Sequence, residues 1–149
     1  MNKATKWFYF GQKHPFFRKM VGIILRTVYA CDLPLNNNGG IGSNCVFEHN
    51  ALGVVISNEV TIGDNCRVYQ HVTIGAGNGG YPKIGNNVTI YANTTIVGGI
   101  IIGDNVIIGA NSFVNKDIPA NTTVGGGLPK LLKEINHEDS CYGGKGVCW

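Results

Sequence analysis

The chain has 149 residues, of which 44% are hydrophobic and only 14% are charged, with 22 glycines and a formal net charge of +3. This composition is too apolar for a disordered protein and is typical of a single domain that buries its own core. The excess positive charge is confined to the start of the chain, so there is no basic stripe over the whole domain of the kind that nucleic-acid-binding proteins carry.

Residues 1–40 are predicted to form a helical cap followed by a loop. The first 30 residues contain six Lys or Arg and no Asp or Glu. A basic, aromatic-rich segment of this kind suits an anionic membrane surface or an acidic partner. The apolar run at 20–25 is too short to span a membrane and no Ala-x-Ala-like cleavage site follows it, so we expect a cytoplasmic protein. The helix is indicated by apolar residues at helical spacing: Phe16, Met20, Ile23, Ile24 and Val28.

A six-residue repeat dominates the rest of the chain. The pattern Ile-Gly-x-Asn occurs five times, and an aliphatic residue recurs every six residues around it. Three such hexads close one triangular coil of about 18 residues, and successive coils stack through parallel backbone hydrogen bonds. A helix would need a period near 3.6, and glycine would destabilise it. The repeat therefore predicts a parallel β-helix over residues 41–127, with a closing segment and tail at 128–149.

Two irregularities interrupt the repeat, and both are candidate functional positions. The first follows His49, where the hexad register shifts by three residues, and the second is a glycine-rich loop at 75–83. A neutral imidazole at His49 suits a general base that deprotonates an alcohol as it attacks a thioester. His71 falls about one coil later, where it would bind the acceptor or support His49. For both histidines the alternative is an ordinary surface side chain.

Metal chemistry and cysteine catalysis are both disfavoured by the sequence. A zinc site of the kind found in β-helix hydratases needs three imidazoles, and the coils contain only His49 and His71. We therefore expect no metal. The five cysteines show no zinc-binding spacing, and Cys45 and Cys66 occupy the same hexad position, which predicts a buried pair in the core rather than nucleophiles.

Stacked coils with small corner residues would accommodate the extended pantetheine arm of acetyl-CoA. Ala92 and Ala110 are separated by one 18-residue coil, so we expect them at the same corner. Lys116 and Lys130 are candidate contacts for the phosphates of the donor. For each lysine the alternative is a solvated surface charge.

Several motifs together resemble the hexapeptide-repeat acyltransferases, most closely the catalytic domain of serine acetyltransferases and their capsule-sugar relatives. They are Glu-His-Asn-Ala-Leu-Gly-Val-Val at 48–55, Val-Thr-Ile-Gly at 72–75, Tyr-Pro-Lys-Ile at 81–84, Ile-Gly-Ala-Asn-Ser at 108–112 and Gly-Leu-Pro at 127–129.

The resemblance implies a left-handed coil and a homotrimer with active sites in the grooves between subunits. His49 would be the catalytic histidine of a direct acetyl transfer without an acyl-enzyme, with backbone N–H groups stabilising the oxyanion. The residues that it places along acetyl-CoA are Ala92, Gly98, Ala110, Lys116, Pro129 and Lys130.

The chain departs from the serine enzymes around the acceptor. Their Arg-His pair before the Pro-Lys of the loop is replaced here by Gly80 and Tyr81, and the loop is shorter. Glu48 stands where the family has Asp, and the Asp that would orient the histidine is represented only by the nearby Asp32. We expect His71, Tyr81 and Lys83 to bind the acceptor.

These departures favour a hydroxyl of a sugar or polysaccharide precursor, such as a capsule or exopolysaccharide unit, as the acceptor. Serine is the alternative acceptor. It ranks second because its carboxylate requires a cation and the loop offers only Lys83. A different class of function, a non-catalytic β-helix scaffold, is the remaining hypothesis. It would need neither a histidine at a register break nor a protruding loop.

Overall fold

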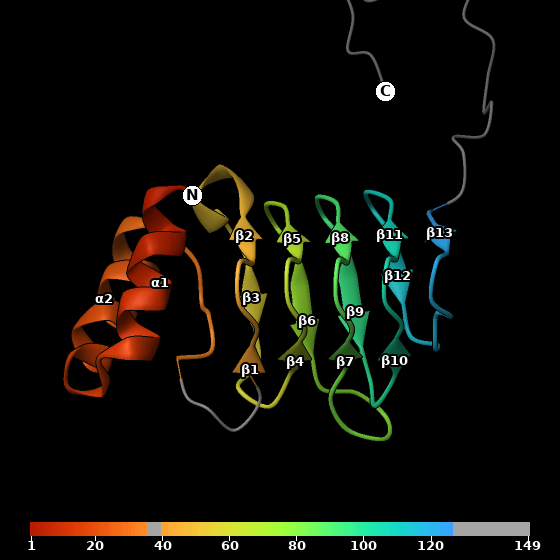
Figure 1. The fold of residues 1–149 in the computed structure, drawn as a ribbon, viewed down its shortest axis with the longest axis horizontal. Coiled ribbons are helices and arrows are strands. Elements are labelled where there is room, and N and C mark those ends of the chain that lie inside the picture. The colour runs from red at the N-terminus through yellow and green to blue at the C-terminus, as the bar shows by residue number, and fades with distance from the viewer. Residues whose placement is uncertain (36–39, 127–149) are drawn as a thin grey trace, which may run out of the picture.

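The computed structural model describes residues 1–35 and 40–126. A pair of helices stacks against one end of a regular coil of short strands, and β13 lies at the other end (Figure 1). The closing segment and tail predicted at 128–149, including Pro129 and Lys130, lie outside the described residues. No helix in the parts of the chain that the structure describes is long and apolar enough to cross a membrane.

The coil consists of three parallel sheets, to which each turn contributes one strand in succession. The first sheet contains β1 (Gly40–Ile41), β4 (Thr61–Ile62), β7 (Lys83–Ile84) and β10 (Ile101–Ile102). The second contains β2 (Val46–Phe47), β5 (Arg67–Val68), β8 (Thr89–Ile90), β11 (Ile107–Ile108) and β13 (Thr123–Val124). The third contains β3 (Val55–Ile56), β6 (Thr73–Gly75), β9 (Thr95–Val97) and β12 (Phe113–Val114). The predicted parallel β-helix is confirmed.

The core is a stack of aliphatic side chains, which explains the six-residue period. The hexad residue on each strand from β1 to β12 points inward and is no more than 7% exposed, while its neighbour on the strand points outward. Like residues stack on like residues: Ile62 pairs with Ile84, and Ile74 with Ile96. Cys45 and Cys66 are buried at equivalent positions of successive coils, as predicted.

Replacing one core isoleucine tests the stacked core. Ile90, which is fully buried in the middle of the second sheet, is expected to lose about 2–5 kcal/mol of unfolding free energy on replacement by alanine, because the neighbouring coils cannot collapse into the cavity. Urea denaturation measures the difference. Ile101→Ala is the matched control, since Ile101 is 58% exposed. Equal losses in the two variants would contradict the assignment of Ile90 to the core.

In the first four occurrences of the repeat, the Gly-x-Asn part forms the corner between the first and second sheets, whereas the fifth, at 108–111, lies between the second and third sheets. A Cβ on Gly63 would lie 2.7 Å from the backbone carbonyl carbon of Gly85 in the next coil, so only glycine allows the coils to stack this closely. The asparagines adopt left-handed φ angles between 56° and 58° at four successive corners, where this residue type is tolerated best. They also form a side-chain ladder, in which Asn87 Nδ2 donates to Asn105 Oδ1 at 3.1 Å.

The helical cap consists of α1 (Lys3–Lys13), a 3₁₀ turn η1 (Pro15–Phe17) and α2 (Arg18–Val28). Helix α1 closes the end of the coil: Phe8 packs edge-on against Phe47, and the Tyr9 hydroxyl donates to Gly42 O at 2.8 Å. The helical segment is confirmed, but its apolar spacing does not mark the buried face. Val21 and Leu25 are the buried residues of α2, whereas the predicted stripe is largely exposed.

Candidate active site

His49 lies on an irregular turn at the corner between the second and third sheets. This turn, η2 (Glu48–Ala51), has three consecutive residues with left-handed φ angles, namely 50° at His49, 57° at Asn50 and 59° at Ala51. Non-glycine residues seldom adopt this conformation, and a run of three is costly unless the surroundings hold it. Ala51 is fully buried and anchors the turn, while His49 is exposed. The three-residue register shift therefore builds a rigid turn that presents an imidazole to solvent.

In the following coils the same corner is made with a single left-handed residue. These residues are His71, Asn93 and Asn111, with φ angles of 56°, 59° and 57°. We call this edge of the β-helix, made of residues 48–53, 69–71, 91–93 and 109–111, the histidine corner. His71 thus occupies the position that asparagine fills one and two coils later.

His71 packs directly against the turn that carries His49. The His71 backbone N–H donates to Leu52 O at 2.8 Å. A Cβ built on Gly53, whose φ is 67°, would clash with His71 Nδ1, so the ring covers this glycine closely. The two predicted histidines therefore lie at one corner on adjacent coils.

Glu48 and Asp32, the two carboxylates predicted to assist His49, each pair with an arginine instead. Glu48 Oε1 lies 3.4 Å from Arg67 Nη1, and Asp32 accepts hydrogen bonds from the Arg26 guanidinium at 3.0–3.2 Å. The Asp32 backbone extends the third sheet, because its N–H donates to Val54 O. Within residues 1–35 and 40–126, neither carboxylate is hydrogen-bonded to His49. Their assistance to His49 stays a prediction.

A column of aromatic rings runs from His49 along the coil axis. This column was not predicted from the sequence. The His49 and Tyr69 ring centroids are 6.1 Å apart, and those of Tyr69 and Tyr91 are 4.8 Å apart. Both tyrosines directly follow strands of the second sheet, and Tyr91 is 39% exposed. Their spacing of 22 residues was the available signal, since it equals the offset that pairs β5 with β8.

The small residues predicted for the pantetheine arm lie at the histidine corner. Asn93 N–H donates to Gln70 O at 3.2 Å, and Asn111 N–H donates to Ala92 O at 2.9 Å. These bonds align Gln70, Ala92 and Ala110 on successive coils. Ala92 and Ala110 therefore continue along the axis from the turn that holds His49.

The remaining predicted residues lie at another edge, the loop corner between the third and first sheets. Here residues 76–82 leave the coil and return through a tight turn, in which Gly77 and Gly80 exchange backbone hydrogen bonds of 3.0 and 3.2 Å. Tyr81 and Lys83 line a pocket of about 330 Å³ on this edge, together with Glu59. Gly98 and Lys116 follow β9 and β12 at equivalent positions of this corner.

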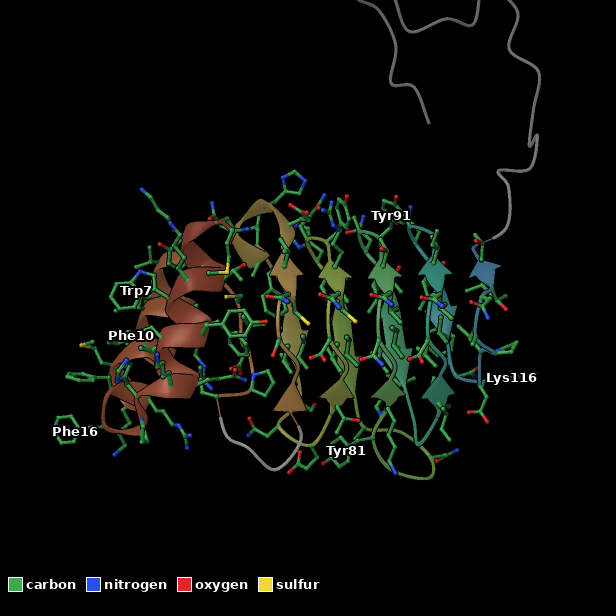
Figure 2. All side chains as sticks on the ribbon, viewed as in Figure 1. Trp7, Phe10, Phe16, Tyr81, Tyr91 and Lys116 are labelled. Carbon is green, nitrogen blue, oxygen red and sulfur yellow. The ribbon has the colours of Figure 1, made fainter. Side chains whose placement is uncertain are left out.

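One chain thus holds two separate groups of predicted site residues. His49, His71, Ala92 and Ala110 gather at the histidine corner, while Tyr81, Lys83, Gly98 and Lys116 gather at the loop corner. Figure 2 shows Tyr91 and Tyr81 on opposite sides of the coil. The loop that was predicted to bind the acceptor is therefore not beside His49 of the same chain.

The three described cysteines, Cys31, Cys45 and Cys66, are all buried, so none presents a thiol to solvent. Burial, followed by the nearby charge of Asp32, raises the pKa of the Cys31 thiol to about 11. The hydrogen bond with Cys45, followed by burial, raises the pKa of Cys66. Cys31 and Cys66 therefore stay protonated near neutral pH. The hydrogen bond with Cys66 lowers the pKa of the Cys45 thiol to about 7, but this side chain is only 1% exposed. The described part of the chain also contains no group of three His, Cys, Asp or Glu residues arranged to hold a metal ion.

Comparisons with known proteins agree with this fold. Residues 81–116 match the family described as bacterial transferase hexapeptide (six repeats). The serine acetyltransferase of Synechococcus elongatus is 33% identical over 130 residues, covering 84% of this chain and 51% of that protein. The serine acetyltransferase of Staphylococcus epidermidis is 47% identical over 99 residues, covering 63% and 46%.

A crystal structure gives the same relationship in three dimensions. Serine acetyltransferase isoform 3 from Entamoeba histolytica, in complex with cysteine, superimposes with a TM-score of 0.73 at 29% identity. The match covers 91% of this chain and 51% of that one. The chain therefore spans about half the length of the relatives that it matches.

Proposed function

We propose that this chain, a hexapeptide-repeat protein with the left-handed β-helix fold of its serine acetyltransferase relatives, is an acetyl-CoA-dependent O-acetyltransferase. The observation that carries the proposal is the turn at 48–53, which holds an exposed imidazole in a strained backbone conformation at a corner of otherwise regular coils. Strain of this kind concentrates at functional sites.

The chemistry follows from a histidine beside a thioester. A ring nitrogen of His49 accepts the proton of the acceptor hydroxyl as its oxygen attacks the thioester carbonyl carbon. The carbon–sulfur bond then breaks, the acetyl group stays on the acceptor oxygen, and the imidazolium returns its proton to the departing thiolate of CoA. Backbone N–H groups at the corner are the natural donors to the oxyanion. No acyl-enzyme is needed.

Ala92 and Ala110 fit the acetyl-CoA donor. Their side chains leave the backbone of the histidine corner accessible to an extended pantetheine arm, in line with His49. Gly98 and Lys116 lie at the other corner, where Lys116 borders a pocket of about 250 Å³ together with Gly125 and Gly126. In a trimer this edge would face the histidine corner of a neighbour, with Lys116 toward the phosphates of the donor.

A homotrimer accounts for the separation of the two groups. A second copy would bring its loop corner, with Tyr81 and Lys83, to the histidine corner of the first. Exposed apolar side chains on the coil faces support such an association, since Ile101, Ile107 and Phe113 are 58%, 42% and 68% exposed. One face of each sheet is thereby available for contact between copies.

Serine is the acceptor that the relatives favour, in place of the sugar that the sequence departures favoured. The matched relatives are serine acetyltransferases, and one of them aligns with 84% of this chain. Lys83 is exposed at the loop corner, directly after the loop, and offers a cation for a carboxylate.

A sugar hydroxyl is retained as a second candidate because of the aromatic column. The rings of Tyr69 and Tyr91 begin beside His49 and give an apolar surface with polar hydroxyl tips, which suits the mixed faces of a sugar ring. The aromatic column thus favours a sugar, whereas Lys83 favours serine.

Competition between acceptors separates these candidates. Thiol release from acetyl-CoA is measured with serine and with a panel of sugars and sugar nucleotides, and kcat/KM is compared. We expect release with serine, and Lys83→Met should raise the KM for serine while hardly changing that for acetyl-CoA. Release with a sugar alone, lost in Tyr91→Ala, would establish the second candidate. No release with any acceptor would refute the proposed activity.

A further inference from the structure

The outer face of the helical cap is apolar and lacks a partner within the described residues. Helix α1 contacts the coil through β2 and η2, and α2 packs on α1 with Val21 and Leu25. The opposite side of this pair carries large exposed side chains: Phe16 is 90% exposed and Ile23 is 63% exposed. We call Phe10, Phe16, Phe17, Met20 and Ile23 the cap face. Figure 2 shows Phe10 and Phe16 at the end of the molecule farthest from β13.

The charge around the cap face has a single sign. Residues 1–31 carry six Lys or Arg and no Asp or Glu. Among the described residues, Arg26 is the one of these cations that forms an ion pair, with Asp32. Lys3 and Lys6 border a pocket of about 350 Å³ with Trp7 and Phe10, so cations and aromatic rings share one surface.

We propose that the cap face binds the surface of an anionic lipid bilayer. Exposed aromatic and aliphatic side chains insert at the boundary between head groups and acyl chains, and the surrounding lysines meet lipid phosphates. A second copy of the chain is a poorer occupant, because face-to-face packing would bring two sets of cations together. An acidic protein would match the charge but would need an apolar pocket of its own to cover Phe16, whereas the head-group boundary of a bilayer covers an exposed ring without one.

The geometry of the cap allows such docking without blocking the histidine corner. Figure 1 shows α1 and α2 running across the direction in which the coils stack. If the two helices lie in the membrane plane, the stack of coils therefore points into water. The histidine corner then extends away from the bilayer, from His49 to Ala110. The 11-residue α2 and its few apolar side chains imply reversible binding.

Vesicle binding tests the proposal with the intact chain and is independent of the proposed acetyl transfer. The protein is centrifuged with vesicles of phosphatidylcholine containing phosphatidylglycerol, and with vesicles of phosphatidylcholine alone. We expect binding to the anionic vesicles, weakened by salt, and about fivefold weaker binding for each cation removed in Lys6→Gln and Lys19→Gln. Phe16→Ser combined with Ile23→Ser should abolish it.

The control is Phe113→Ser, which removes a phenylalanine that is 68% exposed on the coil, away from the cap face. Thermal unfolding by circular dichroism verifies that each variant is folded. Failure of the wild type to bind anionic vesicles, or undiminished binding of the Phe16/Ile23 variant, would overturn the proposal. Concentration-dependent self-association that the same double variant abolishes, without vesicle binding, would instead assign the cap face to a second copy.

Discussion

Replacement of His49 by alanine is expected to lower kcat by about 10²–10⁴-fold, because the acceptor hydroxyl then has no base to take its proton. The fold should survive, since the His49 side chain is exposed and forms no hydrogen bond with another described residue. Steady-state thiol release, with the KM for acetyl-CoA measured alongside, separates a loss of chemistry from a loss of donor binding.

His14→Ala is the control for removing an exposed imidazole from this chain. His14 lies between α1 and η1, away from both corners, and its loss should leave kcat unchanged. If His49→Ala retained wild-type turnover, the assignment of the general base would be wrong. Equal losses in both variants would point to a general effect on folding.

Replacement of Gly53 by alanine is expected to impair both stability and turnover. The added Cβ would clash with His71 Nδ1, and the alanine would have to adopt a φ of 67°, which costs a non-glycine residue about 1–2 kcal/mol. Because Gly53 ends the turn that presents His49, the strain should displace the imidazole. Urea denaturation and thiol release measure the two effects.

Gly40→Ala is the matched control, since a Cβ at Gly40 would contact nothing within 4 Å. Combining Gly53→Ala with His71→Asn should restore part of the lost unfolding free energy, because it removes the ring and keeps a residue suited to the left-handed corner. A variant Gly53→Ala as stable and active as Gly40→Ala would contradict the contact between His71 and the His49 turn.

The coils could be predicted from the sequence because each hexad obeys local rules. Glycine permits adjacent corners to touch, asparagine accepts the left-handed angle, and the aliphatic residue faces inward, so no long-range information is needed. The same regularity made His49 conspicuous as a break. It also aligned Ala92 with Ala110, because the 18-residue coil holds between them.

Features that depend on long-range contacts could not be predicted in this way. Whether Met20 or Val21 is buried depends on where α1 packs against α2, since both residues fit a helical stripe. The Tyr69–Tyr91 column does not follow the 18-residue coil, because the loop at 76–82 lengthens that coil to 22 residues, and the spacing is recognised only once the loop is allowed for. The partners of Glu48 and Asp32 are arginines whose positions follow from the folded chain.

The acceptor shows the limit of motif comparison. The replacement of an Arg-His pair by Gly80 and Tyr81 made a sugar the preferred acceptor on the sequence alone. The relatives favour serine instead, and within this chain the loop corner and His49 lie at different edges of the coil. In the proposed trimer a neighbouring copy would bring the loop corner to His49, so the missing pair alone does not select a sugar.

The most direct test of acetyl transfer at the histidine corner is a stoichiometric one. Purified protein is incubated with acetyl-CoA and serine, and free CoA and acetylated product are quantified together by mass spectrometry for the wild type and for His49→Ala. We predict one acetylated serine for each CoA released, with both lost in the variant. Formation of neither product by the folded wild type, with serine or with any sugar acceptor, would contradict the account.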